Sequence, residues 1–417
     1  MASFSTLSDW LAYLATIHTT SINLGLERIL PIAQQLGVTH FACPVITVAG
    51  TNGKGSTVRA LEALLIAADY KKVFAYTSPH LLHFNERLRM NTQPVDDQSL
   101  IQAFAKIETL RNSQELSFFE FTTLAILDIC KQQQPDALIL EVGLGGRLDA
   151  VNVVESDVAV ITHIAYDHQQ WLGETLEQIG FEKAGIMRRG KVAICGDTEP
   201  PQSILQQAEK IGALLYRARQ DFSYQEEKNT WNWQGFGKNW QQLPYPALKI
   251  SNVACALAAL QGVFINLTLE QVHSALQGLN LTGRQQWIKL PHYPHICLDV
   301  AHNPDSAEAL AAMLKKQNHR GKIFAVCAML EDKDHTGTLA PLLPLVEQWF
   351  VADLDCIRGG KAQLLTPILA HHNAPFRAFP TVQAALNEVE SQAKSNDIIL
   401  VYGSFHTVAE ALKKWPV

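Results

Sequence analysis

Short apolar runs alternate with longer segments of helical periodicity through the first half of the chain. Runs of about four to eight residues rich in Val and Ile suit strands that are buried on both faces of a sheet. Such runs stand at Val45–Val48, Lys72–Tyr76, Ala137–Val142, Val158–Ile164 and Lys191–Cys195. The intervening segments predict helices at Ser56–Asp69, Asp96–Arg111, Glu120–Gln133, Thr175–Met187 and Gln202–Ile211. This alternation predicts an α/β fold with a doubly wound, mostly parallel sheet.

The pattern changes between Asp221 and Leu243. This stretch is polar, lacks helical periodicity, and carries three tryptophans, Trp231, Trp233 and Trp240. It therefore predicts a β-hairpin or meander appended to the first domain, with no evident function. Two helices are expected to follow it, at Asn252–Phe264 and Leu269–Leu276.

A second alternation of strands and helices follows from Ile296 onward. Strands are expected at Ile296–Val300, Lys322–Ala328, Trp349–Ala352 and Ile398–Tyr402. Helices are expected at Ser306–Lys316, Ala362–His371, Val382–Ala393 and Thr407–Trp415. The pattern predicts a smaller, Rossmann-like α/β domain at the carboxyl end. We expect a first domain over residues 1–284 and a second over residues 285–417, with a hinge near residues 281–290.

Composition narrows the class of protein. The chain has 417 residues, of which 47% are hydrophobic and 18% charged, which excludes a disordered or low-complexity polypeptide. Its net charge of -6 argues against broad binding to nucleic acid, which needs a basic face. The sequence shows neither a secretory signal nor a run of about 20 apolar residues, so neither export nor a membrane span is expected. Seven dispersed cysteines give neither a disulfide framework nor a zinc knuckle, and a reducing cytoplasm is expected.

The strongest local motif is a strand, a glycine-rich turn and a helix over residues 45–57. Its glycines permit a tight backbone, the first helical amides point at phosphate oxygens, Lys54 adds positive charge, and the hydroxyl of Ser56 or Thr57 can face a metal ion. The alternative is an ordinary glycine-rich turn. The spacing differs from the Walker pattern, because a glycine directly follows the lysine. The residues expected to bind nucleotide here are Gly50, Thr51, Asn52, Gly53, Lys54, Gly55 and Ser56.

A carboxylate and a histidine follow two other predicted strands. Glu141 ends an apolar run and precedes several glycines, at the sheet edge where ligands of α/β proteins bind. It can hold a hard cation beside phosphates, or it can cap a helix. His168 by itself suggests zinc or manganese rather than magnesium, or a purely structural residue.

The segment Gly-Thr-Asn-Gly-Lys-Gly-Ser at residues 50–56 resembles the ATP loop of the Mur-ligase-like amide ligases, and within them of the folylpolyglutamate synthases. The resemblance is closest to bacterial chains that combine dihydrofolate synthase with folylpolyglutamate synthase. Further matching motifs run in order along almost the whole chain: Leu24–Arg28, Thr77–His80, Asn85–Arg87, Phe119–Glu120, Leu140–Asp149, Asp167–His168, Glu182–Gly185, Gly283–Arg284 and Asp299–Pro304.

The resemblance implies a metal and nucleotide centre. Ser78, Glu141 and His168 would be ligands of magnesium, with two ions expected, and Asp167 would orient the imidazole of His168. Lys183 would act as a carbamate, because a bare ammonium beside magnesium would be repelled. The implied catalytic residues are Lys54, Lys183 and His302.

Further contacts are implied for the nucleotide and for glutamate. Asn252 resembles the family's adenine contact, Asp299 a nucleotide contact from the second domain, and Arg284 a phosphate contact. His302 would bind or orient L-glutamate. Ser404 and His406 are weaker candidates for the substrate, and the Ser404 hydroxyl has the alternative of capping the following helix.

The implied pterin site is made of residues far apart in the chain. Aromatic rings can stack on a flat bicyclic ligand, although a Phe pair that opens a helix has the alternative of belonging to the core. The residues implied by the resemblance are Leu24, Phe118, Phe119, Glu120, Leu148, Asp149 and Ala150.

The implied activity is that of an ATP-dependent acid–amino-acid ligase. It would join L-glutamate to dihydropteroate and to reduced folates through an acyl phosphate, and we expect a monomer. One alternative is a folylpolyglutamate synthase alone. A cell-wall Mur enzyme is disfavoured, because a phosphate loop at residue 50 leaves no room for a preceding UDP-binding domain. A non-catalytic nucleotide switch is disfavoured by the additional metal and lysine positions.

Overall fold

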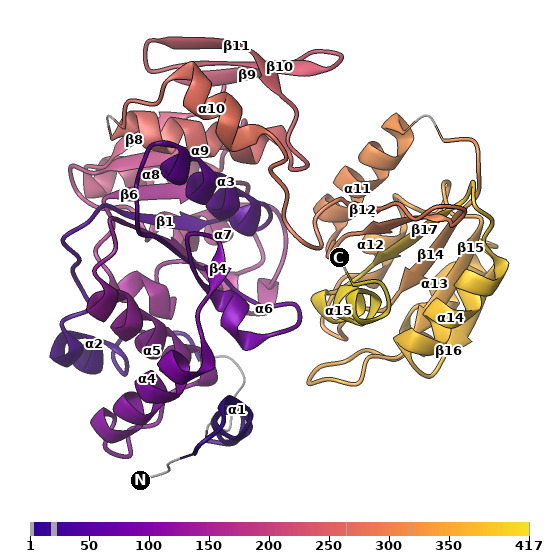
Figure 1. Ribbon diagram of the computed structural model, residues 1–417, viewed down its shortest axis with the longest axis horizontal. Coiled ribbons are helices and arrows are strands. Elements are labelled where there is room, and N and C mark those ends of the chain that lie inside the picture. Colours follow the sequence, from indigo (N-terminus) through magenta and orange to yellow (C-terminus); the bar gives the residue numbers. More distant parts are fainter. Residues whose placement is uncertain (1–3, 18–22, 264, 318, 417) are drawn as a thin grey trace. The chain divides into compact units, whose positions relative to one another are not determined.

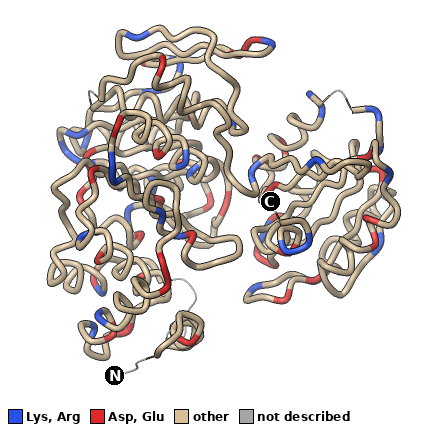
Figure 2. Tube along the Cα trace, in the orientation of Figure 1, with Lys and Arg blue, Asp and Glu red and all other residues tan. Residues whose placement is uncertain are grey.

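The computed structural model describes residues 4–17, 23–263, 265–317 and 319–416. The chain forms two compact units, Met1–Leu279 and Asn280–Val417, and each is described by itself (Figure 1). This division assigns Arg284 to the second unit. Acidic and basic residues are interspersed along the chain of each unit (Figure 2).

The first unit is built on an eight-stranded sheet in the order β4-β3-β2-β5-β1-β6-β7-β8. The six neighbouring strands β2-β5-β1-β6-β7-β8 are parallel to one another. At one edge, β3 pairs antiparallel with β2, and β4 pairs antiparallel with β3. The expected doubly wound, mostly parallel sheet is therefore confirmed. Its strands span Val45–Ala49 (β1), Val73–Tyr76 (β2), Leu88–Met90 (β3), Gln93–Pro94 (β4), Ala137–Glu141 (β5), Val158–Ile161 (β6), Val192–Cys195 (β7) and Leu214–Arg217 (β8).

Helices cover both faces of this sheet (Figure 1). On one face they bury Trp10, Phe104 and Phe121 in a large core, and on the other they bury residues such as Ile179 and Ile204. Side-chain caps begin several of them, for example Asp96 before α4 and Ser117 before α5. The helices are Leu7–Leu14 (α1), Leu30–Leu36 (α2), Lys54–Ala67 (α3), Asp97–Leu110 (α4), Phe118–Gln133 (α5), Gln169–Leu172 (α6), Leu176–Ala184 (α7) and Gln202–Ile211 (α8), with 3-10 turns at Phe84–Arg87 (η1) and Ala150–Val153 (η2).

The tryptophan-rich stretch forms the expected meander. Strands β9 (Phe222–Glu226), β10 (Thr230–Gly235) and β11 (Lys238–Pro244) make a separate antiparallel sheet in the order β11-β10-β9. Helices α9 (Ile250–Gly262) and α10 (Leu269–Leu276) lie beside it (Figure 1). Phe264, at the end of the helix expected from Asn252, lies outside the described residues.

The second unit contains a six-stranded sheet in the order β12-β13-β17-β14-β15-β16. All its neighbouring strands are parallel except β12, which pairs antiparallel with β13. The strands are Gln286–Ile288 (β12), His295–Leu298 (β13), Ile323–Cys327 (β14), Gln348–Ala352 (β15), Phe376–Phe379 (β16) and Ile398–Tyr402 (β17). The helices are Pro304–Lys316 (α11), His335–Leu339 (α12), Thr366–His371 (α13), Val382–Gln392 (α14) and Phe405–Lys414 (α15), with a 3-10 turn at Ala362–Leu364 (η3).

Three differences from the sequence expectations have local causes. The helix expected over Ala362–His371 is split into η3 and α13, because Pro367 begins a new helix. The strand expected to reach Ile164 ends at Ile161, since the next residues turn to bind the glycine-rich loop. Short edge strands such as β4, β8 and β16 were not predicted, because their exposed, mixed composition lacks the apolar runs of buried strands.

No helix in the described part of the chain is both long and apolar enough to cross a membrane. All seven cysteines are free thiols.

Candidate functional site

The glycine-rich turn lies at the carboxyl end of β1, in the middle of the sheet. Gly50 and Gly53 adopt φ angles of +150° and +90°, which favour glycine. A Cβ at Gly50 would collide with the Thr162 side chain, and one at Gly53 with the side-chain amide of Asn252. The structure thus brings Asn252 against the loop, although the two are far apart in sequence. Gly53 is the N-cap of α3 and offers no side chain to the first helical amides.

The loop is held by the segment that follows β6. Thr162 Oγ1 donates to the carbonyl of Asn52 at 2.7 Å, and the Thr51 amide donates to the carbonyl of His163 at 2.7 Å. Thr51 Oγ1 donates to the carbonyl of Ala165 at 3.0 Å. These contacts fix the loop from the neighbouring strand. Sequence reasoning missed Thr162, because a single threonine after a strand carries no recognisable signal.

Lys54 opens α3 and folds back over the turn. Its Nζ donates to the carbonyls of Gly50 at 3.0 Å and Thr51 at 3.2 Å. Ser56 and Thr57 are buried in the same first turn. A cation, helical amides and a curled backbone at the carboxyl edge of a parallel sheet form an anion-binding arrangement.

Glu141 ends β5, the strand next to β1, and is only 5% exposed. Its Oε2 accepts a hydrogen bond from the Ser78 amide at 3.1 Å, so these two predicted metal ligands lie together. His168 adopts a left-handed conformation (φ 52°) before α6, and its Nε2 lies 3.9 Å from Asp167 Oδ1. Within the described ranges, no three His, Cys, Asp or Glu side chains gather as a metal site by themselves.

Lys183 is buried near the end of α7 and is 2% exposed. Burial and, to a smaller extent, the positive charge of Lys54 lower the pKa of its ammonium to about 7, although Asp167 acts in the opposite direction. Lys183, Lys54 and Asp167 therefore share one electrostatic neighbourhood. A large share of the Lys183 amine is neutral near pH 7, which is rare for lysine.

The loop after β5 connects Lys183 with the aromatic candidates. Gly146 packs so closely on α7 that a Cβ there would meet the Glu182 carbonyl at 2.7 Å, and a Cβ at Gly143 would meet the Phe119 ring at 2.7 Å. Phe119 also stacks on Tyr76, with ring centroids 6.2 Å apart. The loop thus contacts an aromatic ring at Gly143 and the backbone of the buried lysine at Gly146.

Asp149 and Leu148 stabilise the same loop. Asp149 accepts hydrogen bonds from the amides of Leu144 and Val151, and Ala150 begins the 3-10 turn η2. Burial raises the pKa of the Asp149 carboxyl to about 7, opposed by these amides and by Lys54. The Leu148 carbonyl accepts from the Gly25 amide at 3.1 Å, which joins the loop after Leu24 to this region.

Phe118 and Glu120 lie at the start of α5. Phe118 packs edge-on against Phe84, and the Arg87 guanidinium lies over both rings. Glu120 is 2% exposed; its carboxylate accepts from the Ser117 amide at 2.7 Å and pairs with Arg28 at 2.8 Å. These contacts give Glu120 a structural task, because they hold the loop of residues 24–28 on α5.

Arg28→Ala is expected to lower the free energy of unfolding by about 2 kcal/mol, because it leaves the Glu120 carboxylate buried without its cation. Urea unfolding measures this loss. The matched control is Arg147→Ala, which removes the exposed ion pair with Glu182 and should cost less than about 1 kcal/mol. Equal losses in both variants would contradict the assignment.

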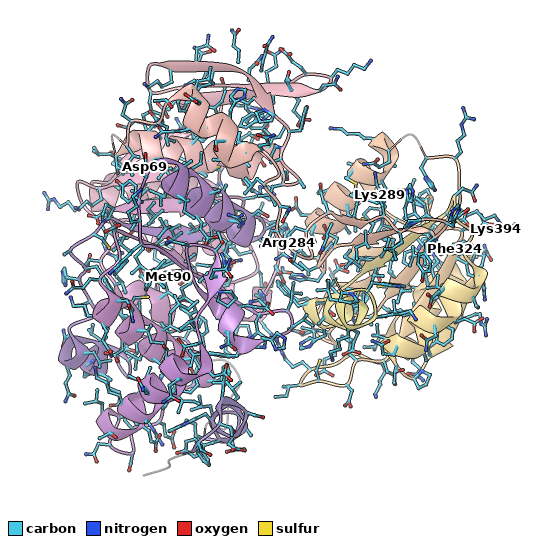
Figure 3. The ribbon with its side chains drawn as sticks, viewed as in Figure 1. Asp69, Met90, Arg284, Lys289, Phe324 and Lys394 are labelled. Carbon is cyan, nitrogen blue, oxygen red and sulfur yellow. The ribbon has the colours of Figure 1, made fainter. Side chains whose placement is uncertain are left out.

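The second unit gathers four candidate side chains at one edge of its sheet. Asp299 follows β13 and is buried; its carboxylate accepts from the amides of Gln285 at 2.9 Å and Ala301 at 2.8 Å. Burial raises the pKa of Asp299, while Arg284 and His302 lower it. The Arg284 guanidinium lies 4.8 Å from the centre of the Phe405 ring. Phe324 and Lys394 lie near the amino ends of β14 and β17. Figure 3 shows Arg284 on the opposite side of this unit from these two residues.

His302 and Ser404 lie beside this group. His302 Nδ1 is 2.8 Å from the Val300 carbonyl, and its ring lies 6.4 Å from that of Phe405. The Ser404 hydroxyl accepts from the Thr407 amide at 3.0 Å and so caps α15, the alternative that the sequence left open. His406 is partly buried, and burial together with Arg358 lowers its pKa.

Both units match known families. Residues 48–259 match the Mur ligase middle domain, and residues 283–405 match the Mur ligase glutamate ligase domain. The dihydrofolate synthase/folylpolyglutamate synthase of Escherichia coli strain K12 is 42% identical over 98% of this chain and 95% of its own length.

Solved structures agree with these matches. A structure of E. coli FolC in complex with DHPP and ADP is 42% identical and superposes with a TM-score of 0.95, covering 100% of this chain and 99% of that one. A bifunctional folylpolyglutamate synthase/dihydrofolate synthase with Mn, AMPPNP and L-glutamate bound is 43% identical, with a TM-score of 0.92 over 99% of this chain and 98% of that one.

Proposed function

Because this chain belongs to the Mur ligase family and, within it, to the dihydrofolate synthase/folylpolyglutamate synthases, we propose that the residues described above carry the steps of an ATP-dependent glutamate ligation. The enzyme is a ligase that joins L-glutamate to dihydropteroate and to reduced folates. The similarity covers almost the whole length of a relative that has both synthase activities. The two alternatives, a synthase with a single activity and a non-catalytic switch, are therefore not favoured. The observation that carries the assignment of roles is the anion-binding turn beside the buried Glu141 and Lys183.

The first chemical step activates a carboxylate that is inert to amines. A substrate carboxylate oxygen attacks the γ-phosphorus of ATP, the bond to the β-phosphate oxygen breaks, and ADP leaves. An acyl phosphate results, and the amino group of glutamate then displaces inorganic phosphate to form the amide. Lys54 and the first amides of α3 neutralise charge on the transferred phosphoryl group, so positioning and electrostatics supply most of the catalysis.

A divalent cation fits the donors near Glu141. Magnesium usually keeps several waters and binds to one or two carboxylates together with substrate phosphates, so it needs no dedicated cage of side chains. This agrees with the small donor pair of Glu141 and Ser78; His168 is proposed as a further ligand, and two ions are proposed. When bound, the metal draws negative charge from the phosphates. A structure with manganese and AMPPNP in a similar enzyme supports a metal–nucleotide pair.

Lys183 is proposed to act as a carbamate. Its neutral amine attacks carbon dioxide, a C–N bond forms, one proton leaves, and an anionic group replaces a potential cation. The lowered pKa of Lys183 supports this step, because only the neutral amine is nucleophilic.

The remaining roles follow the chemistry of each group. Asn252 is proposed to contact adenine, and Asp299 and Arg284 to contact the nucleotide. The pterin would bind against Phe118 and Phe119 and the neighbouring residues Leu24, Glu120, Leu148, Asp149 and Ala150. Ser404 is proposed to contact substrate only through its backbone, because its hydroxyl caps α15.

Release of ADP and phosphate tests the proposed activity. The protein is incubated with ATP, magnesium and L-glutamate, with either dihydropteroate or tetrahydrofolate. Both pterins should stimulate ADP release and give glutamylated products by mass spectrometry. If neither dihydropteroate nor tetrahydrofolate stimulates ADP release, the assignment is refuted.

His302→Ala is expected to raise the KM for L-glutamate by about tenfold or more, while the KM for ATP changes by less than about twofold. His302 follows the carboxyl end of β13, with Nδ1 2.8 Å from the Val300 carbonyl, at the edge of the sheet where ligands of α/β proteins bind. Steady-state kinetics with each substrate varied in turn measure both constants. His295→Ala, at the opposite end of β13, is the control, and the reverse order of the two effects would remove His302 from the glutamate site.

The cellular location and the assembly state are also proposed. The free thiols suit a reducing cytoplasm, and a monomer is the expected state. Light scattering on the purified protein checks the second point.

A further inference from the structure

The small sheet of β9, β10 and β11 stands apart from the groups assigned above, although it carries three of the chain's eight tryptophans. Trp231 and Trp233 on β10 are fully buried, and Trp240 on β11 is 6% exposed. Trp233 stacks on Trp240 with ring centroids 5.1 Å apart. One face of the sheet is therefore apolar and covered, so the sheet packs against another element.

Helix α9 is that element. Every residue of this helix from Asn252 to Gly262 is buried. A helix that is buried all round must be covered by other elements on more than one side. Helix α3 packs on α9, and its Thr57 Oγ1 lies 3.4 Å from the Asn252 carbonyl oxygen. Strand β9 also packs on α9, and the small sheet lies beyond this helix in Figure 1. The helix is thus clamped between the helix of the phosphate loop and the small sheet.

Two side chains of the sheet reach the first turns of α9. Trp233 Nε1 donates to the Ala254 carbonyl at 3.3 Å, and the Tyr224 side chain lies close to that of Ser251. Ser251 immediately precedes Asn252, and Ala254 follows it by two residues. The contacts therefore bracket the residue whose amide lies against Gly53.

We infer that the β9–β11 sheet positions the nucleotide site, with Tyr224 and Trp233 as positioning residues that fix the side chain of Asn252 on the glycine-rich loop. An α-helix transmits a small rotation of its first turn directly to the side chains on that turn. Loss of either contact therefore moves the Asn252 amide relative to Gly53. The inference rests on the proposed contact of Asn252 with adenine.

The sheet contains its own control. Trp231 is as deeply buried as Trp233 and also donates its Nε1 hydrogen to a backbone carbonyl, that of Pro244 at 3.0 Å. This acceptor lies on β11, so the contact stays within the sheet and does not touch α9. Trp231→Phe and Trp233→Phe each remove one indole hydrogen bond and a similar volume, and they differ in which element loses its contact.

The experiment compares Trp233→Phe, Tyr224→Phe and Trp231→Phe with the unaltered full-length protein. Calorimetric titration with AMPPNP and magnesium gives the Kd, and kinetics give kcat, the KM for ATP and for glutamate, and the ratio of kcat/KM for ATP to that for GTP. Trp233→Phe and Tyr224→Phe should each raise the KM for ATP and the Kd for AMPPNP about three- to tenfold. Each should also lower the ratio of kcat/KM for ATP to that for GTP. The KM for glutamate and the kcat should stay within about twofold.

Trp231→Phe should lower the Tm as much as Trp233→Phe and leave nucleotide binding unchanged. The inference is overturned if both tryptophan variants shift nucleotide binding equally, or if Trp233→Phe and Tyr224→Phe change only the Tm. Tyr224→Phe keeps the ring and serves if Trp233→Phe does not fold.

Asn252→Ala separates this inference from the proposed role of Asn252. If Asn252→Ala weakens AMPPNP binding and the sheet variants do not, the positioning role of the sheet fails and the proposed adenine contact stands. If Asn252→Ala leaves AMPPNP binding and the ATP preference unchanged, the adenine contact itself fails, and the inference fails with it.

Discussion

Lys183→Ala is expected to lower ATP-dependent ligation by about 10²- to 10³-fold, and added acetate or propionate should restore part of the rate. The expected loss is comparable to that for removing one group that stabilises charge in a water-excluded site. The truncated side chain leaves room for a small carboxylate, which supplies the anionic oxygens of the proposed carbamate. ADP release at increasing acetate concentration measures the rescue. A fully active alanine variant would end the proposal.

The same lysine gives the rate a dependence on pH and carbon dioxide. The pKa of about 7 is depressed from 10.5, so the amine is mostly protonated below pH 7 and mostly neutral above it. Carbamate formation therefore rises with pH through this window. Enzyme stripped of bicarbonate should regain activity on its addition, more fully at pH 8 than at pH 6.

The control for these measurements is Lys191→Ala. Lys191 is half-exposed and pairs with Asp157 at the surface, so its loss should leave both the rate and its response to bicarbonate unchanged. A bicarbonate response that persists in Lys183→Ala would show that another group is responsible.

Lys54→Met should lower kcat/KM for ATP by about 10²- to 10³-fold, because the variant keeps the length of the side chain and removes its charge from the phosphate loop. The KM for glutamate should change by less than about twofold. Steady-state kinetics and AMPPNP titration measure these effects. A variant that binds AMPPNP normally and turns over at the unaltered rate would contradict the role of Lys54.

The variant has a second expected effect. The charge of Lys54 contributes to the low pKa of Lys183, so Lys54→Met should raise that pKa. The pH range in which bicarbonate is effective would then move upward. Lys71→Met, which removes an exposed ammonium paired with Asp69, is the matched control and should move neither quantity.

The glycine-rich turn, proposed as the phosphate loop, could be predicted from sequence because its elements are contiguous. A buried strand, three glycines, a lysine and a helix follow one another within residues 45–67, so local geometry determines most of the turn. Glu141 could be predicted in the same way, since the end of an apolar strand marks the ligand-binding edge of a parallel sheet.

The partners of these groups could not be predicted from residue patterns. Asn252 lies against Gly53 because α9 packs on α3, and Thr162 holds the loop because β6 is the neighbour of β1. Strand order and helix packing are long-range properties, and a single asparagine or threonine has no periodicity that reports them. The family resemblance pointed to Asn252 without giving its contact.

Side-chain roles within a motif also depended on tertiary structure. Ser404 and Glu120 stand in motifs that suggest substrate binding, but the Ser404 hydroxyl caps α15 and the Glu120 carboxylate holds Arg28 and the start of α5. Both groups are buried, where an unpaired polar atom is costly, so nearby backbone amides and cations bind them first.

The sequence by itself determined the fold class, the two alternations of strands and helices, and the glycine-rich turn, because burial on both faces of a parallel sheet and the conformational freedom of glycine are encoded locally. Only the tertiary structure decided which distant residues meet that loop, which polar groups are already bound, and how far burial shifts the pKa of Lys183. Those properties depend on the environment that the packed chain creates around each group, and no residue specifies its environment alone.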